Sequence, residues 1–310
     1  MVKEKEYKDF ITARETSNLL NINEKKVYAL AQEGKLPGTK ITGKWLFPRA
    51  ELEAFLRERS RQSTGRFLTE LAMKDEIILV AGSHDPAMCL VEGIFHNRNP
   101  RFVIFSSNVG SVEGLRFLQK GLCTISLSHL YDPAADDYNF PFISEIFGGT
   151  DEVVVINLFH RSIGFVSKPE EIASFSALRE RGIRFINRQA GSGIRIRIDQ
   201  MMAAEGLQGG DIAGYGDEAY THYDVVNAIM AGKVGAGVAT ESVSQLTELC
   251  FHRLFEERFD MVIRRSAFFE PKVQAFVEFT RSSQFLSLLA DMKGYDNRDT
   301  GRIMYPRMTQ

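Results

Sequence analysis

Residues 11–56 read ITARETSNLLNINEKKVYALAQEGKLPGTKITGKWLFPRAELEAFL, and this stretch decides how the chain divides. Thr12 and Glu15 have the spacing of a capping box, in which the hydroxyl accepts from the third amide of a helix and the carboxylate returns a bond. Asn23 is placed to cap a second helix, which ends near Gly34. Two short helices joined by a tight turn are therefore predicted.

After these helices the pattern of the stretch changes. Residues 40–47, KITGKWLF, predict two short strands around a Thr-Gly turn. Pro48 suits the first position of a third helix, because the amide hydrogen that proline lacks is not needed there. The inner face of that helix is expected to consist of Leu52, Phe55 and Leu56. Helix, turn, helix, hairpin and helix together predict a small folding unit.

This order of elements resembles the excisionase/MerR-type winged helix-turn-helix domain along the whole stretch. The resemblance implies a recognition helix over residues 23–34, which enters the major groove of double-stranded DNA. The DNA-binding candidates are Lys25, Lys26 and Tyr28 in that helix and Lys40 and Lys44 in the wing. A plain solvated face is the alternative for the two helix lysines, and Trp45 is interpreted as a packing residue. Because lysine lacks the bidentate fork of arginine, no operator sequence is predicted.

The charge of the chain is unevenly distributed. Residues 1–66 hold 14 Lys and Arg against 9 Asp and Glu, a balance of +5, whereas residues 67–310 hold 24 against 31, a balance of −7. A basic N-terminal segment followed by an acidic remainder suits an N-terminal segment that contacts DNA phosphates. Ordinary variation in surface charge is the alternative. A chain of 310 residues is long enough for two or three folding units.

Composition also excludes several classes of protein. The three cysteines, Cys89, Cys123 and Cys250, are too far apart for a metal motif, so free and mostly buried thiols are expected. The sequence contains neither a secretory leader nor a run of about 18 apolar residues. We therefore expect a soluble, cytoplasmic protein that does not contact a membrane and needs no metal or cofactor.

Beyond residue 75 the pattern is that of an α/β body. Apolar runs that end in small polar residues predict buried strands, and helical stretches between them indicate parallel sheets. The expected strands are 76–83, 102–108, 122–128, 183–189 and 259–265, with a strand pair over 151–167 and a final amphipathic helix over 271–292.

Glycine and serine recur where these strands lead into helices. The junctions are Gly82-Ser83, Gly110-Ser111 and Gly191-Ser192-Gly193. Each one directs backbone amides and a hydroxyl to one place at the positive end of a helix, which favours an anion. Three junctions in one chain predict a binding cleft.

The order of these elements is similar to that of the type II periplasmic-binding-protein-like domain of molybdate-type binding proteins and LysR regulators. The similarity rests on the motifs GSHDP (82–86), VGSVEGL (109–115), NLFHRSIGFV (157–166), FINRQAGSGIR (185–195), THYDVV (221–226) and GYD (294–296). It spans residues 76–310 and implies an α/β fold with two lobes and a ligand between them.

The whole chain is thus expected to be a two-lobed α/β periplasmic-binding-protein-like domain with a small N-terminal winged helix-turn-helix domain. The DNA-binding domain would cover residues 1–60, and residues 61–75 would form a linker. One lobe would consist of residues 76–157 and 262–310. The other lobe would consist of residues 163–258, joined to the first by two hinge strands.

Carried onto this sequence, the similarity implies which residues contact the ligand. They are the side chains of Ser83, Ser111, Arg188, Ser192 and Thr221, assisted by the amides of Gly110, Ser111 and Gly193. Arg161, where the chain crosses between the lobes, either binds the ligand or braces the hinge. His84 and His222 are interpreted as hydrogen-bonding residues rather than metal ligands, and Asp85 as a helix cap. Residues 131–139 form a polar loop that is either a lid or plain surface.

The ligand is expected to be a small anion. Ile194 stands where phosphate loops of this fold often carry threonine, which weakens a phosphate assignment. Uncharged hydroxyl and amide donors suit a tetrahedral oxyanion such as molybdate or tungstate. Arg188, if it faces the cleft, suits an organic carboxylate through a bidentate pair. The sequence leaves both classes open.

A DNA-binding domain joined to such a ligand-binding domain predicts a ligand-responsive transcription regulator that acts as a homodimer or larger homo-oligomer. Lobe closure would change the placement of two heads relative to half-sites of fixed spacing. A body that only mediates protein contacts is one alternative. An enzyme is another, but the sequence contains no GxSxG, HExxH or P-loop motif, and Ser83-His84-Asp85 are chain neighbours rather than a triad. We expect no enzymatic activity.

Overall fold

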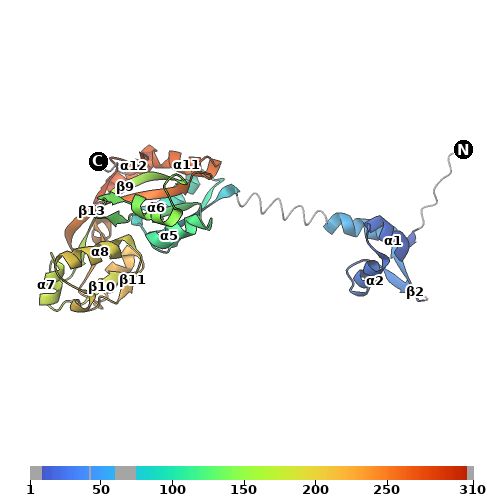
Figure 1. The fold of residues 1–310 in the computed structure, drawn as a ribbon, viewed down its shortest axis with the longest axis horizontal. Coiled ribbons are helices and arrows are strands. Elements are labelled where there is room, and N and C mark those ends of the chain that lie inside the picture. Colours follow the sequence, from blue (N-terminus) through green and yellow to red (C-terminus); the bar gives the residue numbers. More distant parts are fainter. Residues whose placement is uncertain (1–8, 42, 60–74, 306–310) are drawn as a thin grey trace. The chain divides into compact units, whose positions relative to one another are not determined.

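The computed structural model describes residues 9–41, 43–59 and 75–305 (Figure 1). The chain divides into two compact units, residues 1–75 and 76–310, called here the N-terminal unit and the body. The predicted linker lies outside the described residues except for its last residue. Within the described part of the chain, no helix is both long and apolar enough to cross a membrane.

The N-terminal unit combines helices with a three-stranded sheet. Its elements are β1 (Phe10–Thr12), α1 (Ala13–Leu20), α2 (Glu24–Gln32), β2 (Thr39–Ile41), β3 (Lys44–Pro48) and a helix over residues 49–59. The sheet is antiparallel in the order β1-β3-β2, so β2 and β3 form the predicted wing. Strand β1 was not predicted. Pro48 ends β3 instead of opening the third helix, which begins one residue later.

The caps of this unit follow from local sequence. Thr12 Oγ1 accepts from the Glu15 amide at 3.3 Å, and Glu15 Oε2 accepts from the Thr12 amide at 2.8 Å, which confirms the capping box. Asn23 Oδ1 accepts from the Lys26 amide and caps α2. Ring stacking of Trp45 on Phe47, with centroids 6.2 Å apart, supports the packing role expected for the tryptophan. The core consists of Ile11, Ala13, Val27, Ala31, Leu36, Phe47 and Leu52.

The body is built on one continuous sheet in the order β11-β10-β12-β9-β13-β6-β4-β5. Its strands are β4 (Ile77–Gly82), β5 (Val103–Asn108), β6 (Ile125–Ser128), β9 (Val153–Ser167), β10 (Phe185–Arg188), β11 (Glu218–Ala219), β12 (Ala236–Thr240) and β13 (Cys250–Arg264). Strand β4 is parallel to β5 and β6, and β10 is parallel to β11 and β12. Each end of the sheet therefore has its own parallel part, as a two-lobed fold requires. Short strands β14 (Tyr295–Asp296) and β15 (Ile303–Met304) pair with β9.

Helices cover each parallel part and enclose separate cores. The first lobe carries α4 (Pro86–Arg98), α5 (Ser111–Gln119), α6 (Phe140–Phe147), α11 (Pro271–Thr280) and α12 (Ser283–Asp291), and the second carries α7 (Phe175–Glu180), α8 (Gly193–Ala204), α9 (His222–Met230) and α10 (Glu241–Ser244). A cluster with Phe95, Phe159 and Phe276 fills the first lobe, and one with Phe165, Phe175 and Phe185 fills the second. Burial of these phenyl rings accounts for much of the stability of each lobe.

Strands β9 and β13 pair along their length and cross from one lobe to the other (Figure 1). The prediction of a strand pair over 151–167 was wrong, because β9 is one strand of 15 residues. The polar first half of β13 was not predicted at all. Gly164 lets the two strands approach closely, since a Cβ there would lie 2.1 Å from the His252 carbonyl oxygen.

Two further details differ from the sequence prediction. The final helix is broken into α11 and α12, because Ser282 leaves the helix and its hydroxyl caps the next one by accepting from the Phe285 amide. All three cysteines are free, but only Cys123 is buried, whereas Cys250 is half-buried and Cys89 is exposed. The Cys89 sulfur lies 3.5 Å from His84 Nε2.

Candidate functional site

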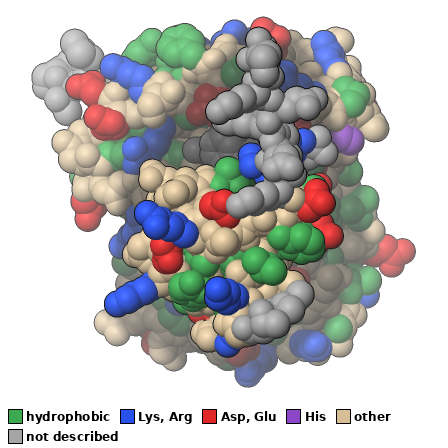
Figure 2. Space-filling model, turned by 90° about the vertical axis from the view of Figure 1, so that its right-hand side faces the viewer, with side chains coloured by type: hydrophobic (Ala, Val, Ile, Leu, Met, Phe, Trp, Pro, Cys, Tyr) green, Lys and Arg blue, Asp and Glu red, His purple; other side chains and the backbone are tan. Residues whose placement is uncertain are grey.

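The DNA-binding candidates lie on the surface of the N-terminal unit. Lys25, Lys26 and Tyr28 are exposed on α2, and Lys40 and Lys44 are exposed on the two paired strands of the wing. All five side chains are therefore accessible to a partner. On the face shown in Figure 2, basic and acidic side chains are interspersed rather than gathered in one basic patch.

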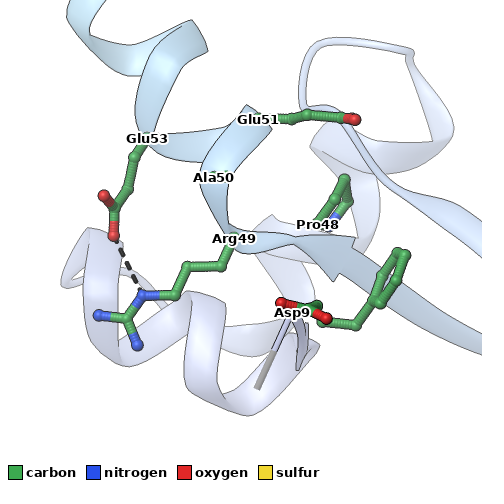
Figure 3. A pocket seen from close by; sticks show the side chains of 7 residues that line it. Asp9, Pro48, Arg49, Ala50, Glu51 and Glu53 are labelled. Carbon is green, nitrogen blue, oxygen red and sulfur yellow. Dashed lines mark hydrogen bonds and ion pairs between the residues drawn. The ribbon is translucent and has the colours of Figure 1, made fainter. Parts of the chain in front are cut away.

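A separate hollow of about 430 Å³ lies on the N-terminal unit where β1 and β3 meet the third helix (Figure 3). Asp9, Glu51 and Glu53 contribute carboxylates to its lining, and the Glu53 carboxylate accepts from Arg49 Nε at 3.1 Å. This excess of acidic groups makes the hollow a poor contact for DNA phosphates. The exposed lysines lie instead on α2 and the wing.

In the body, two of the three predicted glycine-serine junctions meet within the first lobe. Ser83 follows β4 and Ser111 opens α5 after the neighbouring strand β5. Both serines are buried, and their hydroxyl oxygens lie 2.8 Å apart. The Gly110 amide donates to the Gly82 carbonyl at 3.0 Å, which holds the junctions together.

The third junction comes from the second lobe and lies against the other two. The Val112 amide donates to the Gly191 carbonyl across the lobe boundary at 3.4 Å. A Cβ on Gly110 would lie 3.4 Å from the same oxygen. The hydroxyl of Ser192 is occupied locally, because it accepts from the Arg195 amide as the cap of α8. The structure thus brings the three junctions together at the boundary between the lobes.

A buried hydrogen-bond network joins this boundary to the crossing strands. His129 Nε2 lies 2.9 Å from Ser83 Oγ, and His129 Nδ1 lies 2.9 Å from Glu257 Oε2. Glu257 Oε1 accepts from Arg161 Nε at 2.7 Å, and Arg161 also pairs with Asp85. All five of these residues are buried. Arg161 therefore has two carboxylate partners and braces the crossing strands.

Arg188, unlike Arg161, has only neutral hydrogen-bond partners. Its Nε donates to the Ala219 carbonyl at 3.2 Å, its Nη2 to the Tyr220 carbonyl at 2.8 Å and its Nη1 to His222 Nδ1 at 3.2 Å. Among the described residues, no carboxylate forms an ion pair with this buried guanidinium. Burial, and next the charge of Arg161, lower the pKa of Arg188 to about 9. A buried charge with only neutral partners is a strong attractor for an anion.

His222 carries an unused donor beside Arg188. Its Nδ1 lies 3.2 Å from both the Thr240 amide and Arg188 Nη1, so that nitrogen accepts and the ring proton is on Nε2. His222 Nε2 is buried and has no hydrogen-bond partner among the described residues. Burial, followed by the charges of Arg188 and Arg161, places the pKa of His222 well below its ordinary value. The neutral ring thus holds one buried N–H available to a ligand.

The remaining predicted residues have mainly structural contacts. The Thr221 hydroxyl accepts from the Asp224 amide in a capping box at the start of α9. Gly193, at the start of α8, packs against the first lobe, since a Cβ there would lie 2.6 Å from His129 Cε1. Asp85 caps α4 by accepting from the Ala87 amide at 2.7 Å. The positive end of α8 is therefore held against His129.

His84 and the polar loop also lie at the lobe boundary. His84 Nδ1 is 3.5 Å from the His222 amide, and burial lowers the pKa of His84 to about 4 although Asp85 opposes the shift. Within the described residues, no cluster of three or more His, Cys, Asp or Glu side chains is arranged to hold a metal. The loop is a hairpin of β7 (Tyr131–Asp132) and β8 (Asp137–Tyr138), and Arg197 of α8 lies over the Tyr131 ring at 4.1 Å.

Sequence reasoning missed His129 and Glu257. His129 directly follows β6 and could have been found, because Ser83 occupies the same position after the adjacent parallel strand β4. Glu257 carries no such signal, because it lies inside a polar strand whose pairing with Arg161 is visible only in the fold.

The two units match two different protein-family models. Residues 93–281 match the model of the PBP superfamily domain, and residues 10–60 match that of a helix-turn-helix domain. An uncharacterized Bacillus subtilis protein, YvgK, is 24% identical over 302 residues, which cover 94% of this chain and 97% of that protein. These matches confirm the expected fold class, a PBP-like α/β domain behind an N-terminal helix-turn-helix domain.

Two solved structures have the same fold as the body. One is a putative phosphate ABC transporter substrate-binding protein from Clostridium perfringens with bound phosphate, at a TM-score of 0.53 and 14% identity, covering 71% of this chain and 99% of that one. The other is described as a tungstate ABC transporter from Geobacter sulfurreducens, at 0.52 and 11% identity, covering 70% of this chain and 99% of that one.

Proposed function

We propose that this chain, which belongs to the PBP superfamily and carries an N-terminal helix-turn-helix domain, is a DNA-binding regulator that responds to a small anion. The observation that carries the proposal is Arg188, a buried guanidinium whose contacts are two carbonyls and a neutral imidazole. Leaving such a charge without a counter-ion is costly, so an anionic ligand is its natural partner.

The donors around Arg188 indicate the class of anion. Arg188 and the free Nε2–H of His222 lie on the second lobe, and the α8 terminus at Gly193 adds the positive end of a helix. These groups favour a compact ligand with several acceptor oxygens. A tetrahedral oxyanion such as molybdate or tungstate is the first class to test, and the fold shared with the putative phosphate-binding protein and the tungstate ABC transporter supports that choice. An organic carboxylate is the second class.

The regulatory step follows from the two-lobed architecture. Residues on both lobes contribute to the boundary, so a ligand bound there favours the closed arrangement over the open one. In a homodimer, closure of both bodies changes the distance between the two DNA-binding domains. Because the half-sites on DNA have a fixed spacing, this change alters the affinity for DNA. The homodimer is part of the proposal.

A thermal-shift screen of the full chain tests the ligand. The panel consists of molybdate, tungstate, phosphate, sulfate and a set of organic acids. A ligand at 100 times its Kd adds about 2.7 kcal/mol to the stability of the folded body, which gives a clear shift. A shift with any of these anions supports the proposal. No shift with any of them contradicts it and favours a body that only contacts other proteins.

One observation favours a second candidate function, an acyl-transfer enzyme. Ser83, His129 and Glu257 are linked by bonds of 2.9 Å each, the order of nucleophile, base and orienting carboxylate. Binding without turnover remains the leading proposal, because Glu257 is shared with Arg161 and Ser83 is shared with Ser111. Mass spectrometry after treatment with activated esters tests the alternative. A stable acyl adduct on Ser83, absent from Ser83→Ala, would establish it.

A further inference from the structure

The direction of each hydrogen bond in the serine-histidine network can be assigned. Burial alone would raise the pKa of the Glu257 carboxyl, but the hydrogen bonds from His129 and Arg161 and the charge of Arg161 hold that pKa below its ordinary value. An ionised carboxylate only accepts hydrogen bonds, so His129 Nδ1, 2.9 Å from Glu257 Oε2, carries a proton. In the neutral ring the other nitrogen, Nε2, must then accept.

This assignment also fixes the direction in which each serine hydroxyl donates its hydrogen bond. Ser83 is 2.9 Å from His129 Nε2 and must donate to it. The Ser83 oxygen is also 2.8 Å from the Ser111 oxygen, and because its only hydrogen is used, Ser111 is the donor of that bond. Both protons therefore point along the network toward Glu257. In this state the two serines have only lone pairs to offer a ligand.

Lone pairs repel a fully ionised oxyanion, which can only accept hydrogen bonds. One added proton on His129 reverses the network: Nε2–H donates to Ser83, the bond between the two serines is kept, and one serine hydroxyl becomes free to donate outward. A ligand that has its own acidic hydrogen, such as monohydrogen phosphate, can instead donate to a serine oxygen. The state of His129 thus decides which form of anion fits the first lobe.

The surroundings of His129 keep it neutral until an anion arrives. Burial lowers its pKa; Glu257 on β13 opposes that shift, and the charges of Arg161 on β9 and Arg188 on β10 add to it. His222 on α9 and the positive end of α8 at Gly193 also face this region, and the Phe259 ring stacks on the imidazole with centroids 5.5 Å apart. A bound anion offsets the positive groups and favours the imidazolium.

We propose that His129 takes up one proton from solution each time the site binds a fully ionised oxyanion, and that this residue sets which protonation state of ligand is accepted. The inference rests on the proposed function, because it concerns the same site. It names His129, which no sequence pattern assigned, as the selecting residue of the first lobe.

The test is isothermal titration of the full chain with tungstate in two buffers of different ionisation enthalpy at the same pH. The difference in apparent enthalpy gives the number of protons taken up. We expect about one for the wild type, and a tungstate Kd that rises about tenfold per pH unit above neutrality. His129→Gln places a neutral amide beside Ser83 and should bind with no proton uptake and a flat pH profile. The variant His96→Gln, at an exposed position of α4, should behave as the wild type.

The outcomes separate this inference from the proposed function. Tungstate binding to the wild type without proton uptake would overturn the role of His129 while leaving the anion site intact. Uptake of one proton that persists in His129→Gln would assign the proton to another group and also overturn it. If neither tungstate nor any other anion of the panel binds, the proposed function fails and the inference fails with it.

Discussion

Arg188 is the residue on which ligand binding should depend most. A bond from an ionised donor contributes about 1.5–3 kcal/mol, so losing one should weaken binding about tenfold or more. Arg188→Met keeps most of the side-chain volume, and we predict that it removes half or more of the ligand-induced thermal shift. The free protein should unfold at a similar temperature, because the cost of burying the charge disappears with the bonds to Ala219 and Tyr220.

Arg181→Gln is the matched control, because Arg181 is an exposed arginine of the same lobe that pairs only with Glu170 at the surface. It should respond to ligand as the wild type does. A full shift in Arg188→Met would show that the anion is held elsewhere.

The buried histidines predict how stability depends on pH. Burial lowers the pKa of His84 to about 4 and also lowers those of His129 and His222. The unfolded chain takes up protons at these groups below about pH 6.5, whereas the folded body does not. The free energy of unfolding should therefore be fully present above pH 6.5 and fall as the pH is lowered toward 4.

Urea unfolding at several pH values measures this dependence. His84→Asn removes one of the three groups and should flatten the profile, whereas His96→Asn, at an exposed position, serves as the control. A profile for His84→Asn as steep as that of the wild type would contradict the assignment of His84.

At the scale of elements, the capping box should decide the stability of α1. Thr12→Ala removes the acceptor for the Glu15 amide and should cost about 1 kcal/mol. Hydrogen exchange of the α1 amides in the full chain should become correspondingly faster, whereas Thr12→Ser keeps the hydroxyl and should preserve protection. Unchanged exchange in Thr12→Ala would mean that packing alone holds the helix.

The start of α8 should control how closely the lobes approach. The backbone of Gly193 does not require glycine, but a Cβ there would lie 2.6 Å from His129 Cε1. Gly193→Ala should therefore preserve the fold and weaken ligand binding by holding the lobes apart. Gly210→Ala is the matched control, since nothing lies within 4 Å of a Cβ at that position. Small-angle scattering and titration with the same ligand give both readouts, and equal affinity of the two variants would contradict a closed binding state.

The elements also show how far sequence reasoning reaches. Local signals sufficed for the capping box at Thr12, and the glycine-serine pairs correctly placed Ser83 and Ser111 between a strand and the helix that follows it. The first half of β13 could not be predicted, because polar and apolar side chains are mixed on both of its faces. It forms a strand because it pairs with β9. Long-range pairing also explains why β1 and Glu257 were missed.

At the scale of the whole molecule, the exposed lysines of α2 should set the affinity for DNA phosphates. Lys25→Ala should weaken binding similarly on all sequences and reduce the slope of log K against log salt by about 1. Lys120→Ala, in the body, should leave that slope unchanged. Fluorescence anisotropy over a salt series measures both. An unchanged slope in Lys25→Ala would remove α2 from the DNA interface.

The central claim is that ligand binding in the body changes DNA binding by the N-terminal domain. Such coupling is reciprocal, so DNA should change the affinity for the ligand by the same factor. The claim is based on the finding that one chain matches both a helix-turn-helix domain and a PBP superfamily domain.

The most direct measurement is the affinity of the full chain for a DNA fragment selected from a random pool, with and without saturating ligand from the thermal-shift panel. We predict a change in Kd of about 5-fold or more in the wild type and none in Arg188→Met. The same Kd with and without a ligand that demonstrably saturates the body would contradict the account.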